Sequence, residues 1–294
     1  MTPDRTHSIV SSRLKLNVSE WGDPDAPPLI LQHGGRDHSR SWDAVAAEFA
    51  AEYRVIAPDL RGHGDSDWAS DGGYHSMDFI YDLATIFDAL ALPPCAVIGH
   101  SLGGSVATRY AALYPDRFTR FVNIEGLGLS PTAETRQDPI DEGERVRDYF
   151  EQVRRRSGWT PKRYPDIAAV ATRLLEIDER LSPIFAEHLA REGTRPNGDG
   201  SFSLKYDPAF YDNTPVDISA ETRHAMWGRL TCPMLLVYGR QSWASNPRGD
   251  GRMAHFRDAR LEVIDDAGHW AHHDQHDIFI ALTKAFLSEG AAAS

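Results

Sequence analysis

The sequence predicts an α/β fold in which a mainly parallel sheet is flanked by helices. Short apolar runs alternate along the chain with segments of helical periodicity, which is the order of a parallel sheet with crossover helices. The runs at 28–32, 54–57 and 95–98 end in glycine-rich or charged segments, as buried parallel strands do. A chain of 294 residues is long enough to bury a large core of this kind.

The individual elements follow from local periodicity and from their flanking residues. The predicted strands are 14–21, which alternates as a half-exposed strand does, then 28–32, 54–57, 95–98, 121–125, 234–238 and 260–264. The predicted helices are 42–49, 77–90 with Asp78 near its positive end, and one after Ser101 with Val106, Tyr110 and Ala111 on one side.

About a hundred residues separate the strand at 121–125 from the strand at 234–238. Amphipathic helical patterns at 144–156, 167–177 and 183–191, and a polar turn at 196–201, occupy this interval. We therefore expect a core formed by 1–126 and 228–294 and a helical cap formed by 127–227. Because the insertion enters and leaves at the carboxyl ends of neighbouring strands, we expect a lid, although an extra lobe without substrate contact has the same pattern.

Composition restricts the classes of partner. The mean hydropathy is −0.44, and no apolar run approaches the roughly 18 residues of a membrane helix. The polar residues 1–8 do not resemble a secretion signal, so we expect a cytoplasmic protein. A net charge of −12 disfavours nucleic acid and polyanionic substrates. Cys95 and Cys232 lie in apolar runs, which predicts buried thiols.

A nucleophile elbow is predicted at Ser101. The sequence Gly99-His100-Ser101-Leu102-Gly103 follows an apolar strand and precedes a helical pattern, and flanking glycines let the backbone turn sharply and present the serine hydroxyl. A lone motif of this form is weak evidence. Two other segments strengthen the prediction: His33-Gly34-Gly35 follows an earlier strand, and Gly268-His269 lies near the chain end.

From about residue 21 to 286 the chain resembles a capped member of the α/β-hydrolase fold family. The matching segments are 33–35, 59–66, the elbow at 99–103 and 268–269, with serine before histidine as in the family. The resemblance implies that His269 is the general base and that the backbone N–H groups of Gly35 and Leu102 form the oxyanion hole. Such donors stabilise the negative oxygen of a tetrahedral intermediate. His33 and His63 are expected to hold loops through hydrogen bonds.

The acid of the triad departs from the family pattern. Members commonly carry Asp in a Gly-x-x-Asp arrangement after the strand at 234–238, but here Gly239-Arg240-Gln241 is followed by Ser242. Serine cannot stabilise an imidazolium as a carboxylate does. Some haloalkane dehalogenases of this fold carry their acid at the preceding strand end, where this chain has Glu125. We therefore predict Glu125 as the acid, the alternative being a glutamate that only caps the start of the lid.

These residues predict a serine hydrolase that cleaves a small or medium, largely apolar ester or lactone through an acyl-enzyme. Hydrolysis of a carbon-carbon bond in a diketone-like ring-cleavage product stays open, as does a slow-turnover ligand receptor or scaffold. The partner is a small-molecule substrate, with no cofactor, metal or membrane, and either a monomer or a homodimer is possible. The expected pocket residues are Gly34, Arg36, Trp42, His100, Trp243 and Trp270.

Overall fold

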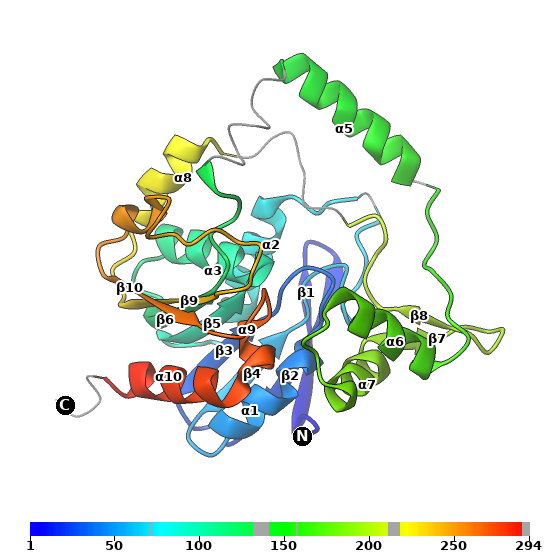
Figure 1. Ribbon diagram of the computed structural model, residues 1–294, viewed down its shortest axis with the longest axis horizontal. Helices are drawn as coiled ribbons and strands as arrows, with labels where there is room; N and C mark the ends of the chain where they lie inside the picture. The colour runs from blue at the N-terminus through cyan, green and yellow to red at the C-terminus, as the bar shows by residue number, and fades with distance from the viewer. Residues whose placement is uncertain (71, 132–140, 157, 211–217, 290–294) are drawn as a thin grey trace.

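The computed structural model describes residues 1–70, 72–131, 141–156, 158–210 and 218–289. An eight-stranded sheet lies at its centre with helices on both faces (Figure 1). The strand order is β1-β2-β4-β3-β5-β6-β9-β10. Strand β2 is antiparallel to both of its neighbours, and every other pairing in this sheet is parallel. The predicted fold class is confirmed.

The elements have the following bounds along the chain. They are β1 (Arg5–Ser11), β2 (Leu14–Trp21), β3 (Pro28–Gln32), η1 (Ser39–Trp42), α1 (Asp43–Phe49), β4 (Arg54–Pro58), α2 (Ser76–Ala89), β5 (Cys95–His100), α3 (Leu102–Leu113), β6 (Phe118–Ile124), α5 (Glu142–Arg156), α6 (Ile167–Ile177), α7 (Pro183–Glu192), β7 (Thr194–Pro196), β8 (Phe202–Leu204), α8 (Ala220–Trp227), β9 (Met234–Gly239), η2 (Arg252–His255), β10 (Ala259–Ile264), α9 (Ala271–Asp274) and α10 (His276–Ser288). Two predicted strands, 14–21 and 28–32, match β2 and β3 residue for residue.

Strand β1 was not predicted from the sequence. It pairs with β2 from Arg5 opposite Glu20 to Ser11 opposite Leu14, and it forms one edge of the sheet. Its polar and charged side chains, which are typical of an edge strand, hide the apolar alternation that marks an inner strand.

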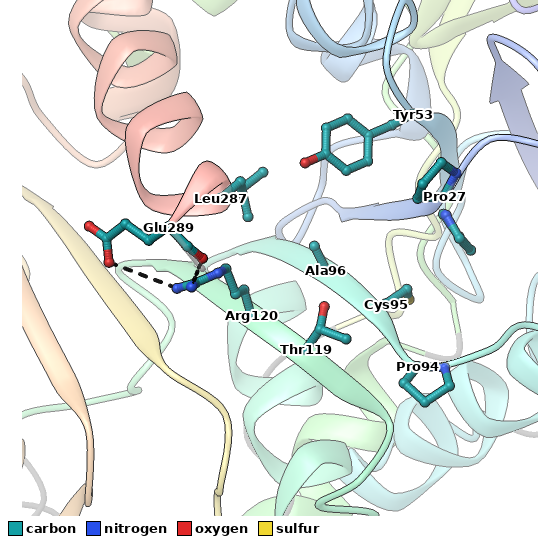
Figure 2. A pocket seen from close by; sticks show the side chains of 10 residues that line it. Pro27, Tyr53, Pro94, Cys95, Ala96, Thr119, Arg120, Leu287 and Glu289 are labelled. Carbon is teal, nitrogen blue, oxygen red and sulfur yellow. Dashed lines mark hydrogen bonds and ion pairs between the residues drawn. The ribbon is translucent and has the colours of Figure 1, made fainter. Parts of the chain in front are cut away.

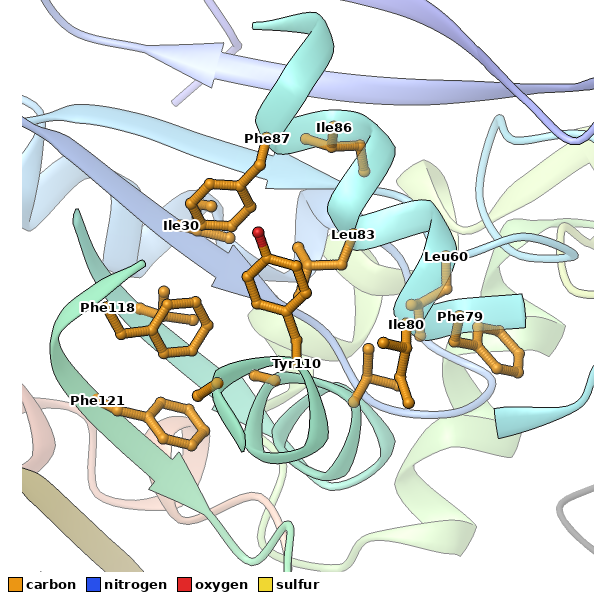
Figure 3. Close-up of a cluster of buried hydrophobic side chains, with 14 of the residues drawn as sticks. Ile30, Leu60, Phe79, Ile80, Leu83, Ile86, Phe87, Tyr110, Phe118 and Phe121 are labelled. Carbon is orange, nitrogen blue, oxygen red and sulfur yellow. The ribbon is translucent and has the colours of Figure 1, made fainter. Parts of the chain in front are cut away.

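The sheet separates two layers of apolar packing. Helices α2, α3 and α8 cover one face, and helices α1 and α10 cover the other. Along β5, Val97 packs into the first layer while Ala96 and Ile98 pack into the second, because successive strand side chains point to opposite faces. In the first layer the rings of Phe87 and Tyr110 stack with centroids 5.0 Å apart (Figure 3). This packing fixes α3 against the strands that carry the site.

The region between β6 and β9 contains α5, α6, α7, the β7-β8 hairpin and α8. Helices α6 and α7 pack together around Val170 and Ala190, and α7 packs against η1 of the core. Helix α5 stands apart from the other helices (Figure 1). The predicted helices at 167–177 and 183–191 match α6 and α7 closely, and the predicted polar turn joins β7 to β8. Residues 127–227 as the boundaries of a cap remain a prediction.

Two further features concern the hydropathy of the helices and the state of the cysteines. Within the described ranges, no helix is both long and apolar enough to cross a membrane. Cys95 and Cys232 are both free and buried. Burial raises the pKa of the Cys95 thiol to about 12 and that of Cys232 to about 11, so both thiols are protonated and unreactive at neutral pH.

Candidate active site

Ser101 lies in a sharp turn between β5 and α3. The last residue of β5, His100, pairs with Ile124 of β6, and helix α3 begins at Leu102. Ser101 between them has φ 50° and ψ −117°, a conformation that costs a non-glycine residue about 1–3 kcal/mol. Its N–H donates to the carbonyl oxygen of Ile124 at 2.8 Å, which holds the turn. The serine hydroxyl is thereby placed above the carboxyl edge of the sheet.

Glu125 occupies the equivalent position on the neighbouring strand. It follows Ile124, the residue that pairs with His100, and it also has a φ of 50°. Its N–H donates to the carbonyl oxygen of Val237 at 3.1 Å, and the Asn123 side chain accepts from the N–H of Gly126 at 2.7 Å. Ser101 and Glu125 therefore stand side by side where two paired strands end.

His269 joins these two side chains. It lies in the loop between β10 and α9, with Nε2 3.0 Å from Ser101 Oγ and Nδ1 2.6 Å from Glu125 Oε2. Because the carboxylate accepts, Nδ1 carries the hydrogen and Nε2 is left to accept the serine proton. The structure thus brings together the three residues predicted as nucleophile, base and acid, in the order that proton transfer requires.

The side chain of Glu125 is fully buried, and its carboxylate is held by three donors. Besides His269, the N–H of Gly239 donates to Oε1 at 2.8 Å and the Ser242 hydroxyl donates to Oε2 at 2.6 Å. Burial of a charged carboxylate is unfavourable unless such donors replace water. Among the described residues, every hydrogen-bond partner of this carboxylate lies at the end of β9 or in the loops after β9 and β10, not at the start of the inserted region.

The proposed oxyanion donors Gly35 and Leu102 both border the cavity beside Ser101. Leu102 is the first residue of α3, where backbone N–H groups have no partner within the helix. A Cβ at Gly103 would clash with the carbonyl oxygens of Gln32 and His33, so the helix start touches the end of β3. A Cβ at Gly34 would lie 2.7 Å from His100 Nδ1. Only glycine lets these backbones approach so closely.

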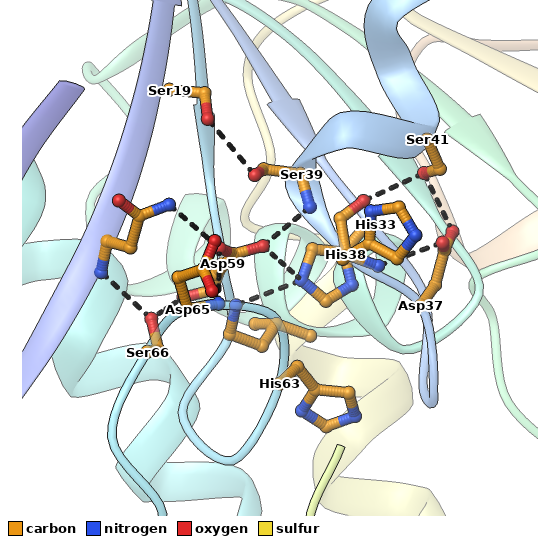
Figure 4. Close-up of polar contacts among 12 residues, drawn as sticks. Ser19, His33, Asp37, His38, Ser39, Ser41, Asp59, His63, Asp65 and Ser66 are labelled. Atoms are coloured by element: carbon orange, nitrogen blue, oxygen red, sulfur yellow. Dashed lines mark hydrogen bonds and ion pairs between the residues drawn. The ribbon is translucent and has the colours of Figure 1, made fainter. Parts of the chain in front are cut away.

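A polar network supports the loop that carries Gly35 (Figure 4). His33 donates from Nδ1 to the Gly34 carbonyl at 2.7 Å and accepts the N–H of Leu60 at Nε2 at 2.9 Å. His63 donates from Nδ1 to the carbonyl of Arg61 at 2.9 Å. Burial lowers the pKa of both imidazoles to about 3, so they are neutral at physiological pH. Both histidines hold loops, as expected from the sequence.

His100 makes a contact that the sequence did not reveal. Its Nε2–H donates to the backbone carbonyl of His269 at 2.9 Å, so the residue before the nucleophile also holds the loop of the base. Burial places the pKa of His100 well below its ordinary value, which keeps the ring neutral. The motif around Ser101 predicted a wall residue here, and nothing in the sequence links positions 100 and 269.

A cavity of about 1550 Å³ opens above Ser101 and extends beneath the inserted region. Of the expected pocket residues, Arg36, His100, Trp243 and Trp270 border it. The ring of Trp243 lies 4.7 Å from the ring of His269 and is 70% exposed. These aromatic rings form the wall next to the base.

Two expected pocket residues do not border this cavity. Trp42 is fully buried and stacks on His272 at 4.7 Å, because its indole fills the apolar layer beneath the loop. Gly34 packs against the ring of His100 and does not border the cavity. In the inserted region, Arg145, Asp148 and Tyr149 of α5 border the cavity. The aromatic residues Phe150 and Phe185, which amphipathicity alone would select, do not.

A second cavity of about 360 Å³ lies at the opposite edge of the sheet (Figure 2). Pro28 and Cys95, the first residues of β3 and β5, border it, so it lies at the amino ends of the strands, far from Ser101. Arg120 forms an ion pair with Glu289 at its rim. In the part of the chain that the structure describes, no group of three or more His, Cys, Asp or Glu side chains is arranged to hold a metal ion.

Comparison with known families agrees with this geometry. Residues 27–275 match the model of the alpha/beta hydrolase fold family. The chain belongs to this family. The matched segment contains Ser101, Glu125 and His269, and also the inserted helices.

Relatives of this α/β hydrolase include several kinds of hydrolase. The 2-hydroxymuconate semialdehyde hydrolase of Pseudomonas sp. (strain CF600) is 28% identical, covering 100% of this chain and 97% of the relative. Esterase YbfF of Escherichia coli (strain K12) is 26% identical over 94% of this chain and 100% of the relative. Mouse epoxide hydrolase 4 is 25% identical over 96% and 78%, respectively.

A solved structure with a similar fold is the thioesterase domain from the curacin biosynthetic pathway. It superimposes with a TM-score of 0.81 at 25% identity, covering 96% of this chain and 99% of that domain. The α/β-hydrolase assignment therefore extends over nearly the whole chain.

Proposed function

We propose that this α/β hydrolase is a serine hydrolase that cleaves a carboxylic ester or lactone through an acyl-enzyme. The observation that carries the proposal is the hydrogen-bonded series from Ser101 Oγ to His269 Nε2 and from His269 Nδ1 to Glu125. A serine with a positioned base whose other nitrogen is held by a carboxylate is the arrangement required for nucleophilic attack on a carbonyl.

In the first half of the reaction, Ser101 Oγ attacks the carbonyl carbon while His269 Nε2 accepts the hydroxyl proton. The N–H groups of Gly35 and Leu102 stabilise the oxyanion, and the loss of one such donor costs about 3 to 4 kcal/mol. When the intermediate collapses, the alkoxide leaves with the proton from His269. Water then attacks the acyl-serine with His269 again as base, which releases the acid and restores Ser101.

The nucleophile argues against epoxide and haloalkane chemistry, despite the epoxide hydrolase among the relatives. An aspartate that attacks a saturated carbon forms an ester, which water can open. Ser101 would form an ether, which lacks a carbonyl for water to attack. The site is therefore suited to acyl transfer.

Carbon-carbon bond hydrolysis is the second candidate. The similarity to two 2-hydroxymuconate semialdehyde hydrolases supports this candidate. The chain aligns with them over nearly its full length at 25% and 28% identity. The same serine would attack a ketone, and His269 would protonate the carbon that leaves. This reaction requires a leaving carbon stabilised by a conjugated carbonyl group.

The experiment compares wild type with Ser101→Ala on a panel of 4-nitrophenyl esters and with a fluorophosphonate probe. We expect ester turnover and probe labelling at Ser101 in wild type, and neither in Ser101→Ala at an unchanged melting temperature. Ser105→Ala, which also changes a serine on the cavity wall, should still be labelled. Labelling at another residue, or Ser101→Ala activity within about tenfold of wild type, would refute the mechanism. If the esters are not hydrolysed but a vinylogous diketone is cleaved, the second candidate holds. If neither substrate is turned over, the result favours a ligand receptor.

A further inference from the structure

Asn123 is a polar residue in the apolar interior of the sheet. Along β6, Phe121 packs into the layer of α2, α3 and α8, whereas Val122 and Ile124 pack into the layer of α1 and α10. Alternation along the strand places Asn123 on the same face as Phe121, toward α3. Asn123 is fully buried, and a buried amide is unfavourable unless it is hydrogen-bonded. An apolar side chain would suit the packing at this position, so the amide requires another explanation.

The amide of Asn123 joins helix α3 to the turn that carries Glu125. Its Nδ2 donates to the Thr108 hydroxyl at 2.9 Å and to the carbonyl oxygen of Gly104 at 3.2 Å, both in α3. Its Oδ1 accepts the N–H of Gly126 at 2.7 Å. Gly126 directly follows Glu125. One side chain therefore links the helix that begins next to the predicted nucleophile with the backbone next to the predicted acid.

The turn at Glu125 has a backbone conformation that its surroundings must maintain. Its φ of 50° lies in a region that is uncommon for residues with a side chain, and such conformations persist only where neighbouring contacts determine them. The N–H of Glu125 donates to the carbonyl oxygen of Val237, and the next N–H, that of Gly126, donates to Asn123. Because the second bond lies directly after the strained residue, its loss would let Glu125 relax and would move the carboxylate away from His269.

The backbones on the two sides of this link are in close contact. A Cβ at Gly126 would lie 2.6 Å from Gly104 Cα and 2.7 Å from Asn123 Oδ1. A Cβ at Gly104 would lie 2.9 Å from the carbonyl oxygen of Gly99, which precedes the elbow. Since glycine is required on both sides, the turn and the helix meet without intervening side chains, and the Asn123 amide fixes their relative position.

We propose that Asn123 is a positioning residue for the acid: by holding the N–H of Gly126, it fixes the turn that directs the Glu125 carboxylate at His269 Nδ1. The inference rests on the proposed acyl transfer at Ser101. Asn123 acts through Glu125 and is not itself a catalytic residue. If the amide only stabilised the contact between β6 and α3, its two bonds to the helix would matter, and its bond to Gly126 would not.

Two substitutions separate these bonds. Asn123→Leu keeps the approximate shape of the side chain but removes all three. Asn123→Asp keeps an oxygen for Gly126, and burial favours its neutral form, whose hydroxyl can donate to α3. With 4-nitrophenyl butyrate we expect kcat of Asn123→Leu to fall by about tenfold or more at nearly constant KM, because a slightly misplaced catalytic group weakens the transition state. Asn123→Asp should stay within about threefold of wild type.

Proton NMR reports on the contact itself. The proton between His269 Nδ1 and Glu125 Oε2, which are 2.6 Å apart, resonates at low field and is assigned by its change in Glu125→Gln. We expect this resonance in wild type and in Asn123→Asp, and its shift or loss in Asn123→Leu. A residue that only stabilises the fold would leave the resonance in place.

Ser11→Ala is the matched control. It removes another buried hydrogen bond, from Ser11 Oγ to Asp82 Oδ1 at 2.6 Å, on the edge strand β1. It should lower the melting temperature without changing kcat or the low-field resonance. A comparable loss of kcat in this variant would show that general destabilisation explains the effect of Asn123→Leu.

The proposal is overturned if Asn123→Leu keeps the resonance and a kcat within about threefold of wild type. It is also overturned if Asn123→Asp melts like wild type but loses as much activity as Asn123→Leu. Asn123→Ala serves for the same comparison should Asn123→Leu not fold. If the fluorophosphonate labels Ser101 and Glu125→Gln lowers kcat while Asn123→Leu does not, only this inference fails. If wild type is not labelled and hydrolyses no ester, the proposed function itself fails.

Discussion

Strands β6 and β9 end next to each other at the candidate active site, yet they contribute different chemistry. Ile124 of β6 pairs with Val237 of β9, and paired strands lie about 4.8 Å apart. After β6 the chain turns at once and presents the carboxylate of Glu125. The end of β9 instead presents the N–H of Gly239, its last residue, and the following loop presents the Ser242 hydroxyl, and both donate to that carboxylate. In the proposed mechanism His269 needs a carboxylate within hydrogen-bond distance of its Nδ1, and the strand after which that carboxylate lies can differ.

Removal of the charge at the end of β6 should have the largest effect on this arrangement. Glu125→Gln retains the size of the side chain but cannot stabilise the His269 imidazolium. We therefore expect kcat to fall by roughly 10³ to 10⁴, which is the scale of loss when the acid of a serine protease triad becomes an amide. The measurement is steady-state hydrolysis of a 4-nitrophenyl ester, with a thermal melt as the control for folding. Activity within about fivefold of wild type would mean that Glu125 is not the acid.

An exchange of the two strand ends should restore part of the loss. Glu125→Ser removes the acid that follows β6, and Ser242→Asp in the same protein places a carboxylate in the loop after β9, within reach of the site that Glu125 Oε2 now occupies. We expect the double variant to exceed Glu125→Ser in kcat by at least about tenfold. No gain, in a double variant that melts like the single one, would show that only the β6 position can serve His269.

Ser242→Ala should have the smallest effect. It removes one of three donors to the buried carboxylate while the bonds from Gly239 and His269 remain, so a decrease in kcat of less than about tenfold is expected. Ser242→Thr keeps the hydroxyl and should lie closer to wild type. A loss as large as that of Glu125→Gln would assign Ser242 a role comparable to that of the acid.

The sequence predicted the three residues that hydrogen bonds join at the candidate active site. The glycines around Ser101, the strand before it and the helix after it define the elbow within one short segment, whereas His269 and Glu125 were predicted from the resemblance to the family. The sheet followed from short apolar runs, except for β1, whose side chains are too polar to indicate a strand.

Other features depend on contacts between distant segments. Trp42 follows a catalytic loop in the sequence, but whether its indole faces the cavity or the core is decided by packing against His272. Which side chains of α5 border the cavity depends on how the helix is oriented in the fold. Tyr149 borders the cavity, whereas the neighbouring Phe150 does not.

The contact between Ser242 and Glu125 also bears on how such a triad can change during evolution. A protein with an aspartate after β9 could acquire a glutamate after β6 before losing the first acid, because the two side chains meet at one point. In that intermediate the two carboxyl groups would share a proton, and one would stay ionised beside the imidazole. Every step of this route retains a charged partner for the base, so the acid can move between strands without an inactive ancestor.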